Sequence, residues 1–263
     1  MNVGRIGGLL TRHLYLYKRS FARLLEIFYW PFLDLVVWGF ITLYLAQQGS
    51  QLHGAVTFFL GALILWDVLF RAQQGIALSF LEEMWARNLM NLFASPLTIG
   101  EYLVATMAMS VLKVMAVGSL MILFALLFYS YDMFMMGLSL VPFVLNLLVS
   151  GWIIGVLTTS IIMRFGQQAE VLAWGMVFLF QPIACVFYPM EVLPDVLQHI
   201  AWIIPPAHIF EGMRSVLLTG SMPVLHLIWA TMLNIGFLIL IVLWFYHTFT
   251  VCKERGMLVR VGE

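Results

Sequence analysis

The sequence predicts an all-α integral membrane protein, a single transmembrane domain over residues 1–263. Of these residues, 63% are hydrophobic and only 10% are charged, whereas a soluble domain has about 25% charged residues. Six apolar runs approach or exceed the roughly 20 residues that cross a bilayer. A more polar stretch with several prolines, residues 181–220, begins at the end of the fifth run and separates it from the sixth. We therefore expect six transmembrane helices, an N-terminal amphipathic interfacial helix, and a re-entrant helical hairpin between spans five and six.

Composition also excludes several function classes. The 13 basic and 13 acidic residues cancel, so bulk charge indicates no nucleic-acid partner. The two cysteines, Cys185 and Cys252, lie near opposite ends of different spans, which argues against an intrachain disulfide, and no metal-ligand motif is present. The first 28 residues contain five basic residues and no long apolar core, so they are not expected to be a cleavable signal peptide.

Residues 5–28 are expected to form the amphipathic helix. At about 100° per residue, one apolar stripe faces a cluster of arginines. Such a helix lies in the membrane interface, with its arginines toward anionic headgroups or a protein partner; a simple anchor is the alternative. The stripe consists of Ile6, Leu10, Leu14, Tyr17, Phe21, Leu24 and Phe28, and the arginines are Arg5, Arg12, Arg19 and Arg23.

The six spans are predicted over residues 30–47, 56–80, 102–129, 138–163, 171–188 and 225–249, followed by a tail over 250–263. Pro31 is placed in the first turn of span one, where a helix tolerates proline. With the N-terminus inside, ten Lys and Arg residues fall on the inner side and one on the outer side, and two lie within spans. This distribution predicts cytoplasmic termini and an outward-facing hairpin.

The inner loop over residues 81–101 contains a candidate docking element. Glu82, Glu83 and Arg87 are expected to open a short helix that ends at Ser95-Pro96, and Thr98 or Gly100 starts the next element. Half-exposed apolar residues on such a loop favour a protein partner; contact with the membrane or with the chain's own spans is the alternative. These apolar residues are Leu89, Met90, Leu92 and Phe93. The short inner loop from Arg164 to Glu170 is expected to make a smaller contact with the same partner.

Four charged residues fall in or near the spans. Asp67 and Arg71 are four apart and can pair along one helix face, so they either neutralise each other or line a polar path. Asp34 is expected about one turn into span one, near the interface. Lys113 lies about halfway along span three and could pair with an acid on a neighbouring helix. Few acids or histidines are staged along the spans, which argues against a proton relay.

The outer hairpin, residues 189–220, is expected to contain two short amphipathic helices separated by Pro205-Pro206. Gly220 and Pro223 stop the second helix, which contains Glu211 and Arg214 three residues apart. The apolar stripe of the first consists of Leu193, Val196, Leu197, Ile200 and Ile204, and that of the second of Ile209, Phe210, Met213, Val216 and Leu217.

These residues resemble the membrane subunit of type-2 ABC exporters, a family of polysaccharide, lipid and drug exporters. The family signature is an aromatic Tyr-Pro pair, a Leu-Pro, a short amphipathic helix, a proline and a Glu-x-x-Arg segment. The matching residues are Phe187, Tyr188, Pro189, Leu193, Pro194, Pro205, Pro206, Glu211 and Arg214. The segment Ser95, Pro96, Leu97 and Thr98 resembles the coupling-helix region, and residues 5–28 resemble the connecting helix.

The resemblance implies a homodimer or heterodimer of this permease in the inner (plasma) membrane, with two copies of a separate ATP-binding subunit docked on the inner loops. Export would run through the dimer interface, with the hairpin as outer gate. ATP and Mg would bind to the partner, which agrees with the absence of a GxxxxGK[ST] phosphate loop here; this chain is then expected to have no catalytic residues of its own.

Two other functions remain open. A gradient-driven carrier or channel would favour staged intramembrane acids and an internal repeat, and neither is evident in the sequence. A membrane anchor without transport activity leaves the outer hairpin unexplained. The aromatic-rich, nearly uncharged interior favours an amphipathic substrate, such as a lipid, a lipid-linked glycan or a hydrophobic drug.

Overall fold

The computed structural model describes residues 1–47 and 53–257, and within these ranges every regular element is a helix. The positions predicted for the tail from 258 onward, Arg260 included, lie outside the described residues. The elements are α1 (Val3–Lys18), α2 (Phe21–Gln47), α3 (His53–Trp85), α4 (Leu89–Ala94), α5 (Ile99–Tyr129), η2 (Met133–Ser139), α6 (Leu140–Phe165), η3 (Gly166–Ala169), α7 (Leu172–Phe180), η4 (Met190–Val192), α8 (Asp195–Ala201), α9 (Pro205–Thr219) and α10 (Val224–Glu254).

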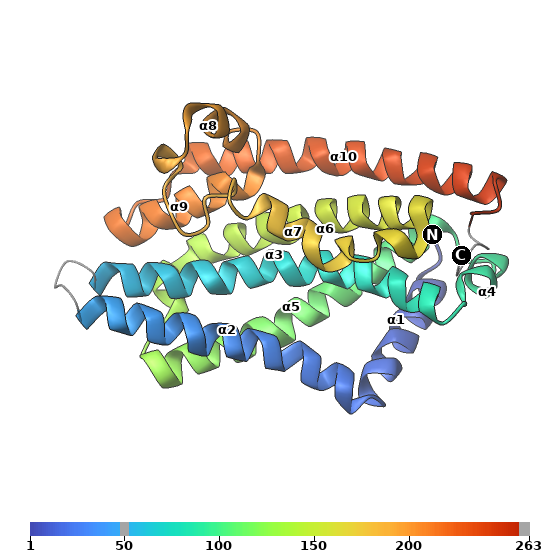
Figure 1. The fold of residues 1–263 in the computed structure, drawn as a ribbon, viewed down its shortest axis with the longest axis horizontal. Coiled ribbons are helices and arrows are strands. Elements are labelled where there is room, and N and C mark those ends of the chain that lie inside the picture. The colour runs from blue at the N-terminus through green and yellow to red at the C-terminus, as the bar shows by residue number, and fades with distance from the viewer. Residues whose placement is uncertain (48–52, 258–263) are drawn as a thin grey trace.

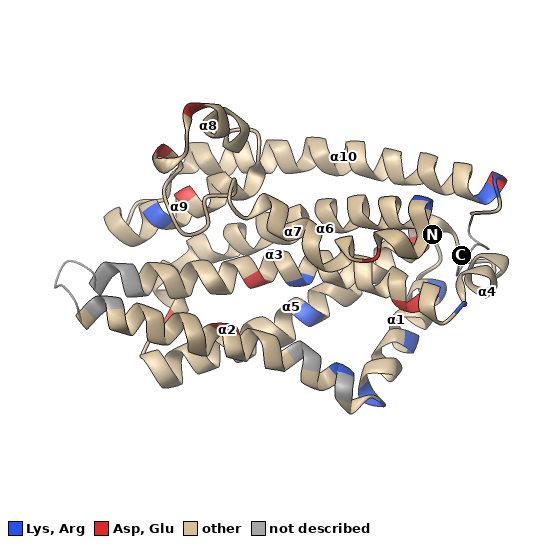
Figure 2. Ribbon diagram, viewed as in Figure 1, with Lys and Arg blue, Asp and Glu red and all other residues tan. Residues whose placement is uncertain are grey.

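Five long helices, α2, α3, α5, α6 and α10, run lengthwise through the molecule (Figure 1). The start of α1, the whole of α4 and the last turns of α10 lie at one end of this bundle, here called the α4 end. The α8–α9 segment lies toward the opposite end, the hairpin end. Basic residues gather at the α4 end, and few charges lie midway along the bundle (Figure 2).

Within the described ranges, four helical segments are long and apolar enough to cross a membrane: Arg23–Tyr44, Ile99–Tyr129, Met133–Ala169 and Val224–Glu254. They correspond to the predicted first, third, fourth and sixth spans. The second predicted span forms the 33-residue α3, which contains charged residues and is not among these four. Large apolar side chains on α5 and α10 point outward, such as Leu127, Met232 and Leu243. This pattern fits helices whose outer faces contact lipid.

The fifth predicted span, 171–188, is shorter than expected. Helix α7 has nine residues, or about 14 Å at 1.5 Å per residue, less than half of a 30 Å hydrocarbon core. Pro182 lacks the N–H that would continue the helix, and Cys185 adopts a left-handed φ of 55°. Residues 181–185 therefore form turns.

The prediction of one amphipathic helix over 5–28 is wrong at its centre. The helix stops at Lys18, and Ser20 starts α2 by accepting a hydrogen bond from the N–H of Arg23 through its hydroxyl (3.4 Å). Because α2 begins at Phe21, Pro31 lies inside this helix and not in its first turn. Prolines are tolerated inside membrane helices, where neighbouring groups satisfy the freed carbonyl.

Several predicted helix boundaries are confirmed. Helix α4 ends at Ala94, before Ser95-Pro96. Thr98 caps α5 in a reciprocal capping box with Glu101. Helix α9 starts at Pro205 and ends before Gly220, which adopts a φ of 68°.

Helix α3 is the central element of the bundle, since it packs against α2, α5, α6, α7 and α9. It lies very close to α6 at Gly151 and Gly155. A methyl group added to Gly151 would lie 2.5 Å from the Cβ of Ala72 and 2.5 Å from the carbonyl oxygen of Leu69. Small residues at such crossings let two backbones approach closely, a common way of packing helices in membranes.

We expect Gly151→Ala to destabilise the protein by about 1–3 kcal/mol, the usual cost of overpacking a tight contact. Gly236→Ala on α10 is the matched control, because a methyl group there meets no atom within 4 Å. Thermal unfolding of the detergent-purified proteins measures both. Equal melting temperatures for the two variants would contradict the close α3–α6 contact.

Candidate functional site

Three arginines tie the N-terminal segment to acids at the α4 end of α3 and α5. The Nη1 atom of Arg12 lies 2.5 Å from the Oε1 atom of Glu83. Arg23 approaches Glu82 at 3.7 Å, and Arg5 approaches Glu101 at 3.6 Å. The carboxylates of Glu83 and Glu101 are 1% and 2% exposed. Arginines that were expected to face headgroups or a partner therefore bind acids of their own chain.

Arg19 is the exception among the four arginines of the predicted connecting helix. It follows the last residue of α1, its side chain is exposed, and its guanidinium lies 5.9 Å from the centre of the Tyr15 ring. Together with Arg12 and Arg23 it borders a shallow surface hollow. Arg19 therefore remains available for a headgroup or a partner protein.

Glu83 connects three segments at the α4 end. One carboxylate oxygen pairs with Arg12 of α1, and the other accepts a hydrogen bond of 2.6 Å from the side-chain amide of Asn88. Asn88 is the residue that precedes α4. Glu82 and Glu83 were expected to open the short loop helix, but they belong to the last turn of α3, and α4 begins at Leu89. Arg87, with a φ of 51°, makes the sharp turn between the two helices.

The predicted docking residues of α4 point in different directions. Leu89 and Leu92 are buried. Phe93 packs against the rings of Tyr102 and Phe249, at 6.0 and 4.9 Å between centroids. The exposed positions are Met90, which is 52% exposed, and Asn91, Ala94, Ser95 and Pro96, while Leu97 is partly buried. Leu92 and Phe93 therefore hold α4 in place, and Met90 is the large apolar side chain that α4 presents outward.

The two predicted inner loops meet at the α4 end. Trp85, at the end of α3, donates a hydrogen bond of 3.0 Å to Glu170 through its indole nitrogen. Its ring also stacks on Trp174 at 6.0 Å. Arg164 lies in the last turn of α6, with its side chain exposed. A partner at the α4 end can therefore reach both loops at once.

The predicted Asp67–Arg71 pair is present inside the bundle. The guanidinium of Arg71 donates to the Asp67 carboxylate at 3.1 Å and to the side-chain oxygen of Gln74 at 3.0 Å. Lys113 of α5 is buried, with its ammonium 4.7 Å from the centre of the Tyr17 ring, and its charge acts on Glu82. The three intramembrane charged residues of the sequence prediction therefore lie along one side of α3.

Two cavities border this line of charged residues. One, of about 120 Å³, lies toward the α4 end and is lined by Arg23, Arg71, Lys113 and Glu82 together with Trp85 and Trp174. The other, of about 260 Å³, is lined by Asp34 and Asp67 among mainly aromatic side chains. Asp34 was expected one turn into span one, near the interface. Because α2 begins at Phe21, Asp34 lies at its midpoint instead.

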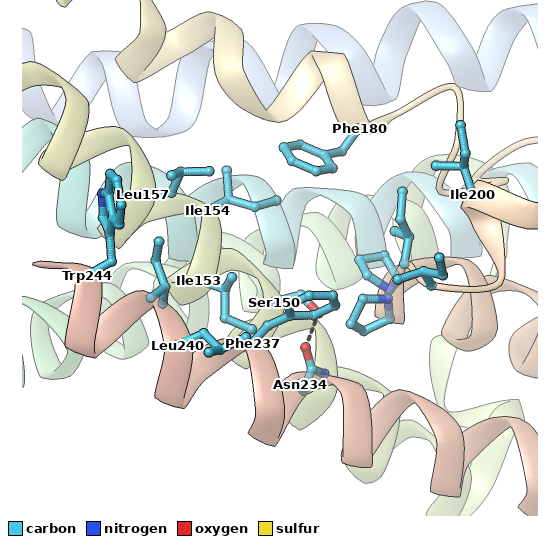
Figure 3. A pocket seen from close by; sticks show the side chains of 15 residues that line it. Ser150, Ile153, Ile154, Leu157, Phe180, Ile200, Asn234, Phe237, Leu240 and Trp244 are labelled. Carbon is cyan, nitrogen blue, oxygen red and sulfur yellow. Dashed lines mark hydrogen bonds between the residues drawn. The ribbon is translucent and has the colours of Figure 1, made fainter. Parts of the chain in front are cut away.

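The largest cavity, about 640 Å³, lies on another side of the bundle between α6, α10 and the α8–α9 segment (Figure 3). Its lining is almost wholly apolar and includes Ile154, Leu157, Phe180, Phe237 and Trp244. Its one visible polar contact is the 2.8 Å hydrogen bond from Ser150 to Asn234 (Figure 3). Such a groove can hold acyl or other apolar groups but offers little to orient a polar one.

The Glu211–Arg214 pair holds the hairpin segment together. Arg214 lies 2.8 Å from Glu211 and donates to the carbonyl of Cys185 at 3.1 Å. Glu211 accepts from the backbone N–H of Met190 at 2.6 Å. The guanidinium of Arg214 also lies 4.7 Å from the Phe58 ring centre on α3. Both residues therefore link α9 to the chain that follows α7 and to the central helix.

The remaining predicted gate residues frame the same segment. The Tyr188 hydroxyl donates to the carbonyl of Pro182 at 2.5 Å. Pro189 and Pro194 precede η4 and α8, while Leu193, whose carbonyl accepts from Gln198, is buried. Pro205 and Pro206 are the first two residues of α9, and both line the apolar cavity.

Sequence reasoning missed a cluster of Trp202, His208 and His226. His208 Nε2 donates to the carbonyl of Trp202 at 2.9 Å, which leaves Nδ1 to accept from His226 Nδ1 at 3.1 Å. Burial lowers the pKa of His208, so the residue is neutral at neutral pH. The cluster joins α9 to α10, and no spacing in the sequence signals it.

The α4-end ion pairs give a first prediction for this site. Glu83→Gln should let α1 detach more often, since it removes a charge-assisted hydrogen bond of roughly 1.5–3 kcal/mol. The side chain of Arg12 is 38% exposed. Because solvent screens such a pair, we expect a loss of free energy near the lower limit of this range. We expect amide hydrogen exchange in α1 about tenfold faster, because 1.4 kcal/mol is a factor of ten. Arg19→Gln is the control, and equal exchange in both variants would argue against the pairing.

His13 gives a second prediction. It is fully buried on α1, and neither ring nitrogen has a hydrogen-bond partner among the residues that the structure describes. Burial lowers its pKa to about 4, and Lys113, Arg12 and Arg23 act in the same direction, while Glu83 opposes them. The folded pKa lies below the unfolded value near 6.5. The contribution of neutral His13 to the free energy of unfolding is therefore fully present above pH 6.5 and is lost as the pH falls toward 4. His13→Leu should reduce the loss of melting temperature between pH 7 and pH 4.5; an unchanged loss would contradict this.

Comparison with known proteins agrees with this architecture. The family model "ABC-2 type transporter" matches residues 10–218, well over half of the chain. No curated protein matches the sequence significantly. The matched region contains most of the N-terminal segment, the whole of α4 and the hairpin through the Glu211–Arg214 pair. The chain belongs to the ABC-2 type transporter family, as a membrane permease domain of type-2 ABC transporters.

Proposed function

We propose that this chain is the transmembrane permease subunit of an ATP-driven exporter that moves an amphipathic substrate outward through a dimer interface. Membership of the ABC-2 family supports a membrane subunit of an ABC system. A separate ATP-binding subunit, two copies per transporter, supplies the energy. ATP and Mg bind to that partner, and a second copy of this permease or a homologous one completes the path.

The observation that carries this proposal is the construction of the α4 end. Helix α4 presents Met90 outward, while Leu89, Leu92 and Phe93 fix it to the bundle. A force applied to α4 reaches α3 through Asn88 and Glu83, and reaches α1 through the Glu83–Arg12 pair. A partner that pushes on α4 would therefore move the N-terminal segment and the central helix together. A carrier driven by a gradient alone has no use for such an element.

In this proposal the protein has six spans in the cell inner membrane, with both termini in the cytoplasm. The four long apolar helices are supplemented by α3 and by the α7 region. The excess of basic residues at the α4 end supports its cytoplasmic orientation (Figure 2). The α8–α9 hairpin then lies at the outer side, where the Glu211–Arg214 pair holds the gate segment against α3.

The experiment that tests this function purifies the tagged chain from its native membrane in mild detergent. The expected result is a co-purifying subunit that hydrolyses MgATP, and substrate movement in vesicles that stops when ATP is removed. Purification without any ATPase, combined with transport that persists under an ion gradient alone, would overturn the proposal and favour a gradient-driven carrier.

A single substitution sharpens this test. Met90→Glu should abolish co-purification of the ATPase, because it places a charge on the exposed apolar position of α4. Met135→Glu is the matched control, since Met135 is similarly exposed, at 57%, but lies in η2, well outside α4. Full ATPase recovery with the Met90 variant would show that α4 is not the docking element.

A further inference from the structure

The 260 Å³ cavity beside Asp34 is chemically unlike the large apolar groove. It lies between α2, α3, α5 and α7. Five of its lining side chains are aromatic, two are carboxylates, and one is the amide Gln181. The aromatic residues are Trp38, Trp66, Phe70, Phe178 and Phe187.

Asp34 makes no hydrogen bond or ion pair within the described part of the chain. Its side chain is exposed and lines the cavity. It lies 13 residues from each end of α2, at a depth where an ionised side chain costs roughly 2.5–3.5 kcal/mol on insertion scales. A carboxylate kept at that depth needs a positively charged partner or water.

Arg71 does not fully supply that partner. It donates to Asp67 at 3.1 Å and to Gln74 at 3.0 Å, so neither of these hydrogen bonds is made with Asp34. Its charge still acts on both aspartates. Asp34 and Asp67 both line the cavity, and no Lys or Arg is among the described side chains around it. Because Asp67 is paired with Arg71, Asp34 is the carboxylate left without an ion-pair partner there.

The rings around the carboxylates suit an organic cation. Trp38 and Phe187 stack at 5.3 Å with planes 17° apart, and Phe70 packs against Phe178 at 5.4 Å. Aromatic faces attract ammonium groups within about 6 Å, more strongly when the site is shielded from water. A hard metal ion fits poorly, because Ca²⁺ or Mg²⁺ needs about six oxygen ligands. Nor is there any group of three or more His, Cys, Asp and Glu side chains suited to a metal within the described ranges.

We infer that this cavity binds the ammonium group of an amphiphilic substrate, with Asp34 as its counter-ion and the aromatic rings around its alkyl substituents. This inference rests on the proposed export function, for which it names the class of substrate: an organic cation with an apolar body. Asp67 remains paired with Arg71, which leaves Asp34 as the carboxylate that meets the cation.

Binding to the purified full-length protein tests this inference without ATP or a partner. Benzyltrimethylammonium is the cationic probe, and benzenesulfonate, of similar size, is the anionic one; calorimetry in a nonionic detergent measures both. We expect the cation to bind and the anion not to bind. Asp34→Asn should weaken cation binding about tenfold, Asp34→Glu should restore most of it, and Trp38→Leu should weaken it less.

Asp132→Asn is the matched control, because Asp132 is an exposed aspartate outside this cavity. Asp34 makes no hydrogen bond or ion pair within the described part of the chain, so its variants should change the melting temperature little. Equal affinity for the two probes, or equal cation affinity in the Asp34→Asn and Asp132→Asn variants, would overturn the inference. Neither outcome would contradict the export proposal, which is tested separately by co-purification of an ATPase and by ATP-dependent transport.

Discussion

The pairing of arginines from the N-terminal segment with Glu82, Glu83 and Glu101 is the interaction on which the α4 end depends. Two of these carboxylates are almost fully buried, and a buried charge that loses its partner is strongly destabilising. The pairs therefore fix where α1 lies, how α2 enters the bundle and where α4 begins. They also join the ends of separate helices into one connected unit.

The sequence predicted the helical class and most boundaries because local rules decide them. Long apolar runs, the Thr98 capping box and the prolines at 205 and 206 act through nearby residues. The failures have non-local or competing causes. Ser20 interrupts an apparently continuous amphipathic pattern, and this break together with the early start of α2 moved Pro31 and Asp34 to mid-helix. At the fifth span, an apolar run looked long enough to cross, but Pro182 and the left-handed Cys185 end its helix early.

The site was predicted in part. Asp67 with Arg71, and Glu211 with Arg214, pair as their spacing indicates. The direction in which α4 faces was not predictable. The sequence pattern of Leu92 and Phe93 is the same whether these side chains contact a partner or pack inside the bundle, as Phe93 does against Tyr102 and Phe249. The partners of Arg5, Arg12 and Arg23 lie roughly 60–100 positions away in the chain, so no pattern could link them. The His208–His226 contact is likewise a product of tertiary packing.

The close contact of α3 with α6 has a mechanical consequence. Where backbones meet at Gly151 and Gly155, neither helix can slide or rotate without a steric clash. Helices α3 and α6 thus behave as one rigid unit. A change in the shape of the bundle must therefore come from the helices packed around α3 and α6. Helix α2 packs against α3, and Arg214 joins the hairpin segment to α3, so either part can move relative to α3 and α6 only by breaking these contacts.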